Sequence, residues 1–148
     1  MSKPATTEDA RPALAAHVAS KGTEVREKYG RPSIGWPELV ALLQDRSLVR
    51  YPCEIVFDAA RLLPGEFAYP APKGARPEDG FTLFVHPHFA RRLDEVPLLV
   101  LYQLVRVNYG EFAGPAEAEG FGAAALGMAR DDYYRTLCAL ADETVDEG

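Results

Sequence analysis

The chain is built around residues 96–110, which read VPLLVLYQLVRVNYG and carry one formal charge, Arg106. Apolar residues stand at nearly every position of this segment, and a helix that is apolar all round is a buried helix. Its ends carry helix signals as well, because Asp94 can cap the start, Pro97 suits the first turn and Gly110 suits the position after the end. We therefore predict a buried central helix, with the rest of the chain packed around it.

The whole chain has the length and composition of an ordinary globular domain. Its 148 residues are 47% hydrophobic and 26% charged, which suits a single core. Arg106 interrupts the longest apolar run, which stays shorter than the roughly 18 residues that a membrane span needs. The first nine residues hold no apolar segment typical of a secretory signal, so we expect a cytoplasmic protein. The net charge of −6 disfavours nucleic acid as a partner, because phosphate binding needs clustered basic side chains.

The segments around the central helix change their hydrophobic period along the chain. Some alternate with period two or form short apolar runs bounded by Gly and Pro, as strands do, while the others repeat at helical spacing. The expected elements, in order, are helices at 13–29 and 37–46, strands at 53–58, 66–69 and 81–86, the central helix, a helix from Pro115 and a last helix from Asp131 or Asp132. Because strands and helices are segregated, we predict an α+β fold with a small antiparallel or mixed sheet of about three strands packed on the central helix.

The predicted domain organisation is simple. Residues 1–10 are expected to be a disordered leader, residues 11–143 a single α+β domain and residues 144–148 an acidic tail. The two cysteines, Cys53 and Cys138, are far apart in the sequence and lack the spacing of metal ligands. We therefore expect both thiols to stay reduced.

Three short motifs carry the side chains that could form a functional site. They are Tyr102, Gln103 and Arg106 on the central helix, Glu117 and Glu119 at the start of the next helix, and His86 and His88 after the last strand. Residues four apart share a helix face, so Tyr102 and Arg106 point to one side. Two histidines at a strand end could bind a metal, but zinc needs at least a third ligand and none has an obvious spacing. We therefore favour two ordinary histidines and predict no bound metal.

The run from Phe81 to Met128 resembles the core of small zincin metallopeptidases, notably the compact intracellular type found in phage-immunity and stress-response regulators. In that family a strand leads to a buried helix with the motif His-Glu-x-x-His, and the following helix often supplies a glutamate as third zinc ligand. Here FTLFVHP at residues 81–87 looks like the strand beside the cleft, and LYQLVR at 101–106 falls where the active-site helix would be. EAEGFGAA at residues 117–124 is similar to the glutamate-bearing helix.

Three positions depart from the zincin motif. Tyr102 stands where the first histidine ligand would be, Gln103 replaces the general-base glutamate, and Arg106 replaces the second histidine. Zinc hydrolysis needs about three protein ligands and a base for the bound water, whereas arginine does not ligate zinc and glutamine does not accept the proton. Only the third ligand could remain, as Glu117 or Glu119. The resemblance thus implies a zincin-like fold whose metal site is lost, without a cofactor.

Arg106 admits two interpretations. A buried cation needs a partner, so an ion pair of Arg106 with Glu117 or Glu119, flanked by Tyr102, could occupy the place of the metal. Alternatively, Arg106 reaches the surface and the two glutamates simply favour the start of their helix.

The function predicted from these residues is a non-catalytic binding or regulatory protein, an inactive metallopeptidase homologue that holds a peptide or protein. An exposed strand at residues 81–86 could accept the peptide as a further strand. The aromatic residues Tyr109, Phe112, Tyr133 and Tyr134 could add a protein-binding edge. One alternative is a metal-dependent hydrolase with a rearranged site made of His86, His88 and Glu117 or Glu119. Another is a structural subunit of a larger assembly, which would show a broad apolar surface patch.

Overall fold

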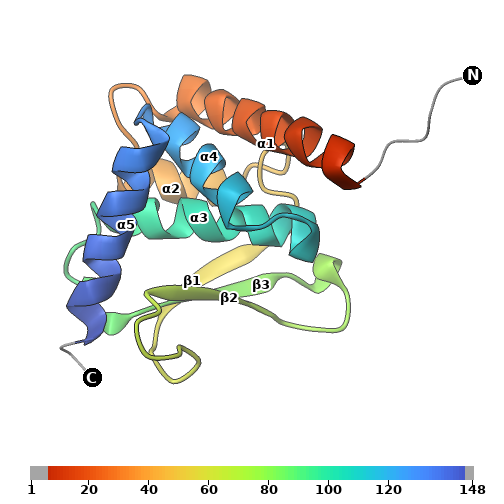
Figure 1. Ribbon diagram of the computed structural model, residues 1–148. Helices are drawn as coiled ribbons and strands as arrows, with labels where there is room; N and C mark the ends of the chain where they lie inside the picture. The colour runs from red at the N-terminus through yellow and green to blue at the C-terminus, as the bar shows by residue number, and fades with distance from the viewer. Residues whose placement is uncertain (1–6, 146–148) are drawn as a thin grey trace, which may run out of the picture.

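In the computed structural model, which describes residues 7–145, three strands form one small mixed sheet (Figure 1). The strands are β1 (Cys53–Phe57), β2 (Ala68–Pro72) and β3 (Phe81–Val85). β3 lies in the middle, parallel to β1 and antiparallel to β2. Their alternating side chains pack one face of the sheet against the helices, with Ile55, Leu83 and Val85 pointing to that side.

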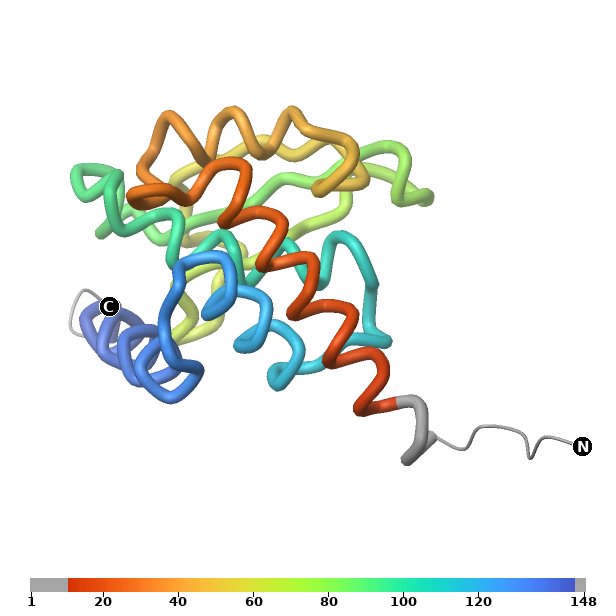
Figure 2. The backbone as a smooth tube through the Cα atoms, turned by 90° about the horizontal axis from the view of Figure 1, so that it is seen from above, coloured from red at the N-terminus to blue at the C-terminus, as the bar shows by residue number. Residues whose placement is uncertain are grey.

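Five helices lie over that face. They are α1 (Thr7–Tyr29), α2 (Trp36–Leu43), α3 (Val96–Tyr109), α4 (Pro115–Leu126) and α5 (Arg130–Val145), with short 3-10 turns at Pro77–Asp79, Pro87–Phe89 and Gly110–Phe112. α3 lies directly on the sheet, and α1 and α4 pack together above it. Figure 2 shows α1 crossing the molecule, with α2 on one side of it and α4 and α5 on the other. The predicted α+β fold, with about three strands and a central helix, is confirmed.

The central helix is buried as predicted, and ten of the fourteen residues of α3 are buried. Gly110 ends it with a positive φ of 64°, a conformation that glycine adopts without strain. The predicted cap at Asp94 is wrong. Glu95 holds the N-cap position without a side-chain cap bond, and its carboxylate pairs instead with Arg92, with Nη2–Oε2 at 2.6 Å.

Both predicted domain boundaries lie too far inside the chain. α1 begins at Thr7, so residues 7–10 are helical and were wrongly assigned to the leader. Pro12 inside this helix is a residue that usually marks a helix boundary. At the other end, Thr144 belongs to α5 and not to a tail, and its hydroxyl donates to the Ala141 carbonyl oxygen at 2.7 Å. The rest of the predicted leader and tail, residues 1–6 and 146–148, lies outside the described residues.

Small residues let the helices approach closely, as the glycines and alanines of residues 120–124 indicate. Gly22 of α1 lies against the backbone of Phe121, and an added Cβ would overlap the Phe121 carbonyl oxygen. Gly122 of α4 lies against the ring of Tyr133, which is fully buried. The Tyr133 hydroxyl donates to the Leu98 carbonyl oxygen at 2.6 Å. α5 is thereby fixed to both α3 and α4.

Cys53 and Cys138 are both free thiols, as predicted. Within residues 7–145, no helix is both long and apolar enough to cross a membrane.

Candidate functional site

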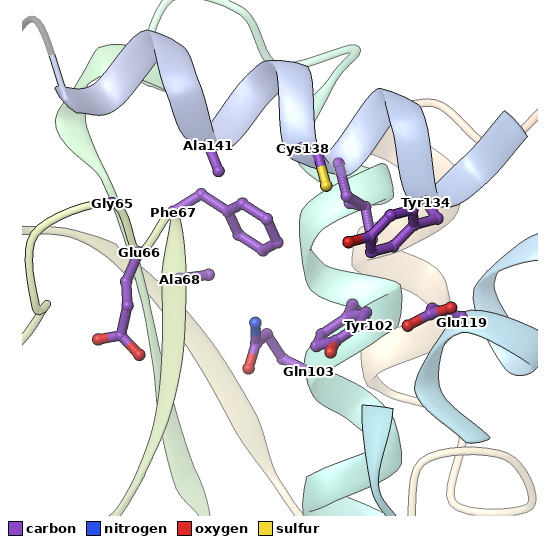
Figure 3. A pocket seen from close by; sticks show the side chains of 11 residues that line it. Gly65, Glu66, Phe67, Ala68, Tyr102, Gln103, Glu119, Tyr134, Cys138 and Ala141 are labelled. Atoms are coloured by element: carbon purple, nitrogen blue, oxygen red, sulfur yellow. The ribbon is translucent and has the colours of Figure 1, made fainter. Parts of the chain in front are cut away.

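A cavity of about 270 Å³ opens between β2, α3, α4 and α5 (Figure 3). Its walls are largely apolar, and the side chains of Phe67, Tyr102, Tyr134 and Leu137 form much of them. A concave, mostly apolar space with a few polar groups is the usual form of a binding site. We refer to this space as the central cavity.

Gln103 lies at the bottom of the central cavity and points into it (Figure 3). The residue is only 8% exposed, yet its carboxamide makes no hydrogen bond to any residue in the described part of the chain. Neither polar atom of the carboxamide is fully buried, because both open to the solvent of the cavity. Gln103 therefore offers both a donor and an acceptor to a molecule that enters the cavity.

Tyr102 and Glu119 form the side of the cavity nearest α4. Glu119 is mostly buried, and its Oε1 accepts from Arg130 Nε at 3.3 Å. The ring of Tyr102 meets the ring of Phe67 edge to face, with 6.3 Å between centroids. Burial, and to a lesser degree the Glu119 carboxylate, raises the pKa of the Tyr102 hydroxyl. The hydroxyl therefore remains neutral, because this environment opposes additional negative charge.

The two cysteines have different environments. Cys138 on α5 is exposed and its sulfur points into the central cavity (Figure 3). Cys53 on β1 is partly buried, and this burial raises the pKa of its thiol to about 11. Because the thiolate is the reactive form, an alkylating reagent should modify Cys138 in preference to Cys53.

Two neighbouring hollows extend the central cavity into a longer groove. A hollow of about 300 Å³ shares Tyr102 and Gln103 with the cavity and continues to Arg106 and Pro115. On the opposite side, a hollow of about 270 Å³ shares Gly65 and Glu66 with the cavity and continues to His86. We call the three spaces together the groove.

Three of the seven residues predicted for the site, Tyr102, Gln103 and Glu119, line the central cavity. Arg106 lines only the neighbouring hollow. Its side chain is 56% exposed, and Glu111 is the acid with which it pairs, at 3.9 Å. The ion pair predicted between Arg106 and Glu117 or Glu119 is therefore absent, and the interpretation in which Arg106 reaches the surface is confirmed.

Glu117 points away from the central cavity and holds α1 against α4. Its Oε1 accepts from Arg11 Nη1 at 2.7 Å, and the carboxylate is almost fully buried. Burial alone would raise the pKa of Glu117, but the hydrogen bond from Arg11 and bonds from the backbone lower it overall. A buried carboxylate with its own cation is a structural group, so only Glu119 of the two glutamates can contact a ligand in the cavity.

The two histidines separate rather than converge. His86 lines the far hollow, and its Nδ1 accepts from the His88 backbone N–H at 3.1 Å. His88 turns to α5, where its Nε2 lies 3.0 Å from Glu143 Oε1. Among the side chains of residues 11–145, no group of three or more His, Cys, Asp or Glu could hold a metal ion. The rearranged hydrolase site is thus not assembled, because His86, His88 and Glu119 face three different spaces.

Acid should loosen α5 through Glu143. Bonds from Arg92 and then His88 lower the pKa of Glu143 to about 2 from the usual value of 4.5. A carboxylate whose pKa is lower in the folded state stabilises the fold above its unfolded pKa, and this stabilisation is lost as the pH falls through the folded value. Glu143→Gln should therefore be less stable than the wild type at pH 7, and this difference should shrink between pH 4.5 and 2.

Urea unfolding at a series of pH values measures this difference. Asp142→Asn is the matched control, because it removes the same charge from an exposed neighbour that makes no ion pair within the described residues. A loss of stability in Glu143→Gln that is the same at pH 7 and pH 2.5 would contradict the role of the ionised carboxylate.

The strand at residues 81–86 does not lie at a sheet edge, so its predicted role in accepting a peptide strand is wrong. β3 is paired on both sides, and the chain places β2 at the edge next to the cavity. Bonds at the two ends of β2 show which of its backbone groups face β3. The His86 N–H donates to the Phe67 oxygen, and the Lys73 N–H donates to the Gly80 oxygen.

Backbone groups alternate in direction along an antiparallel pair, so the groups of Ala68, Pro70 and Pro72 point to the open edge of β2. The two prolines have no N–H to offer there. This edge presents three carbonyl oxygens and a single N–H, from Ala68. Prolines at such positions are a common protection against strand addition.

That α5 forms the upper wall of the central cavity was not predicted from the sequence. Its contribution comes from Tyr134, Leu137, Cys138 and Ala141. These positions follow the spacing of one helix face, and that spacing could have indicated a shared wall. Among these four residues, only Tyr134 belonged to the aromatic set predicted as a protein-binding edge.

Comparison of the chain with protein-family models, with characterised proteins and with solved structures gave no match.

Proposed function

We propose that this chain is a non-catalytic binding protein that holds a segment of a partner protein in the groove. The observation that carries the proposal is Gln103, a largely buried residue whose carboxamide opens into the central cavity and has no partner in the described residues. A few polar groups that face an otherwise apolar pocket are what fixes the orientation of a bound ligand. Gln103 supplies such a group to a ligand that exchanges hydrogen bonds with it.

The proposal includes descent from a zincin-like protein whose metal ligands have been replaced. It is supported by the position of Glu119, because this glutamate of α4 and the pair Tyr102 and Gln103 of α3 line one cavity. That is the convergence the resemblance implies for the metal site. Neither a tyrosine nor a glutamine at these positions supplies the ligand or the base for hydrolysis, which favours binding without catalysis.

The exposed apolar side chains support a protein partner. Three large, exposed apolar side chains line the groove, namely Leu63, Tyr134 and Val145. A fourth, Phe112, is 85% exposed, and its two neighbours in the sequence line the hollow that contains Arg106. Aromatic residues are enriched in protein interfaces. Since three of these four side chains line the groove, they favour a segment docked in it.

The prolines of β2 favour docking by side chains. A peptide that added to this edge as a strand would find carbonyl oxygens at Pro70 and Pro72 but no N–H groups for its own carbonyls. Unpaired peptide carbonyls reduce affinity. The partner segment is therefore proposed to insert a side chain into the central cavity instead of extending the sheet.

Chemical blocking of Cys138 tests this proposal. Peptides would be selected from a displayed random library on the wild-type chain, and their dissociation constants measured before and after alkylation with a bulky maleimide. We expect alkylation to weaken binding at least about tenfold, because the adduct occupies the space over Gln103. The folded protein is modified directly, so the result does not depend on whether a variant folds.

The control is Cys138→Ser treated with the same maleimide, which should bind the peptides as before. If the alkylated wild type binds the selected peptides normally, or if no peptide is selected at micromolar affinity, the groove is not the binding site.

A further inference from the structure

We infer that the central cavity receives the basic side chain, lysine or arginine, of the partner segment. This inference rests on the proposed function and names the group that enters the cavity. The structural basis is a juxtaposition of three aromatic rings, a mostly buried carboxylate and the unpaired carboxamide of Gln103.

The aromatic rings belong to Phe67 just before β2, to Tyr102 of α3 and to Tyr134 of α5. Figure 3 shows Phe67 and Tyr134 extending from opposite sides toward the middle of the cavity, above Gln103. Aromatic faces attract ammonium and guanidinium groups, most strongly where water is excluded. They also provide apolar surface for the methylene stem of a lysine or arginine.

The charge of the wall has one sign. Glu119 lies in the wall and Glu66 at its rim, and no lysine, arginine or histidine lines the central cavity. Arg130 engages only Oε1 of Glu119, through its Nε, so Oε2 has no hydrogen-bond partner in the described part of the chain. A cation in the cavity can therefore pair with Oε2 while Arg130 keeps its bond to Oε1.

The other ligand classes fit this wall less well. An acidic side chain would meet the Glu119 carboxylate, the same charge that helps to raise the pKa of Tyr102. A purely apolar side chain would bury Gln103 further without pairing its carboxamide, which costs free energy. A basic side chain can bond to the Gln103 oxygen and place its stem against Leu137. The net charge of −6 on the whole chain also favours encounter with a basic segment.

The test uses short Gly-Ser peptides that differ only in their central residue, which is lysine, arginine, norleucine or glutamate. Each is titrated into the full chain, and the side-chain amide signals of Gln103 are followed by NMR. We expect saturable shifts with lysine or arginine and a dissociation constant about five- to tenfold lower than with norleucine. The glutamate peptide should give no shift.

Two variants assign the preference to the cavity. Glu119→Gln should reduce the preference for lysine over norleucine to about twofold or less, because it removes the mostly buried carboxylate beside Tyr102. Glu54→Gln removes the same charge from β1, where Glu54 is exposed and pairs with Lys73 at 3.0 Å. This control should keep the full preference.

The outcomes separate this inference from the proposed function. If norleucine binds as tightly as lysine, or if Glu119→Gln keeps the preference, the basic side chain is the wrong occupant. The groove remains a binding site in that case provided that alkylation of Cys138 still blocks the selected peptides. Failure of that blocking overturns the function itself, whatever the order of the four peptides.

Discussion

Replacing Gly122 with alanine will destabilise the fold by about 2 kcal/mol, because the added methyl group overlaps the ring of Tyr133. That ring is fully buried, and its hydroxyl is bonded to the Leu98 carbonyl oxygen. It therefore has little freedom to move aside. The clash outweighs the gain of up to about 1 kcal/mol that alanine brings over glycine inside a helix. The free energy of unfolding in urea, followed by circular dichroism, measures the loss.

Gly120 provides a matched control in the same helix. An added Cβ at Gly120 meets no atom within 4 Å, so Gly120→Ala should stabilise the fold by about 0.5–1 kcal/mol through helix propensity alone. The same substitution, two residues apart, is thus expected to act with opposite sign. If both variants are stabilised equally, α5 does not pack on α4 through Tyr133. The wall that α5 gives the cavity would then lie elsewhere.

The fold class was predictable because the sequence of the central helix clearly indicates a buried helix. An uninterrupted apolar segment with Pro97 near its start and Gly110 after its end has few other structures available. The order of the strands was not predictable, since local periodicity shows which residues form a strand but not which neighbour each strand pairs with. β3 therefore was expected at an edge, although it pairs on both sides.

The candidate site was predictable only where its residues share one helix or a nearby turn. Tyr102 and Gln103 are adjacent, and Glu119 begins the following helix, so the three could be grouped from the sequence. Whether the Arg106 side chain is buried depends on how α3 is rotated against the sheet. The observed rotation leaves this side chain at the surface. The wall from α5 depends on long-range packing between Tyr133 and Gly122, which no local pattern encodes.

Gln103→Leu is the second substitution for which a large effect is expected, and it should change stability and binding in opposite directions. Leucine has a similar size and buries more apolar surface at a position that is only 8% exposed, so the unfolding free energy should rise slightly, by up to about 1 kcal/mol. A ligand that bonds to the carboxamide loses its partner, so binding should weaken at least about tenfold. Opposite changes of this kind are the mark of a residue kept for function at a cost in stability.

Gln44→Leu is the control, because Gln44 is the other glutamine of the chain and lies exposed at the C-cap of α2. It should change neither quantity appreciably. A loss of stability in Gln103→Leu would mean that the carboxamide is a structural group with partners in the folded chain.

The dissociation constant of a selected peptide for Gln103→Leu, measured beside that for the wild type, tests the central claim most directly. The structure predicts a dissociation constant at least about tenfold higher for the variant, together with a more stable fold. An unchanged dissociation constant in a correctly folded Gln103→Leu would contradict the assignment of the cavity over Gln103 as the site where this protein holds its partner.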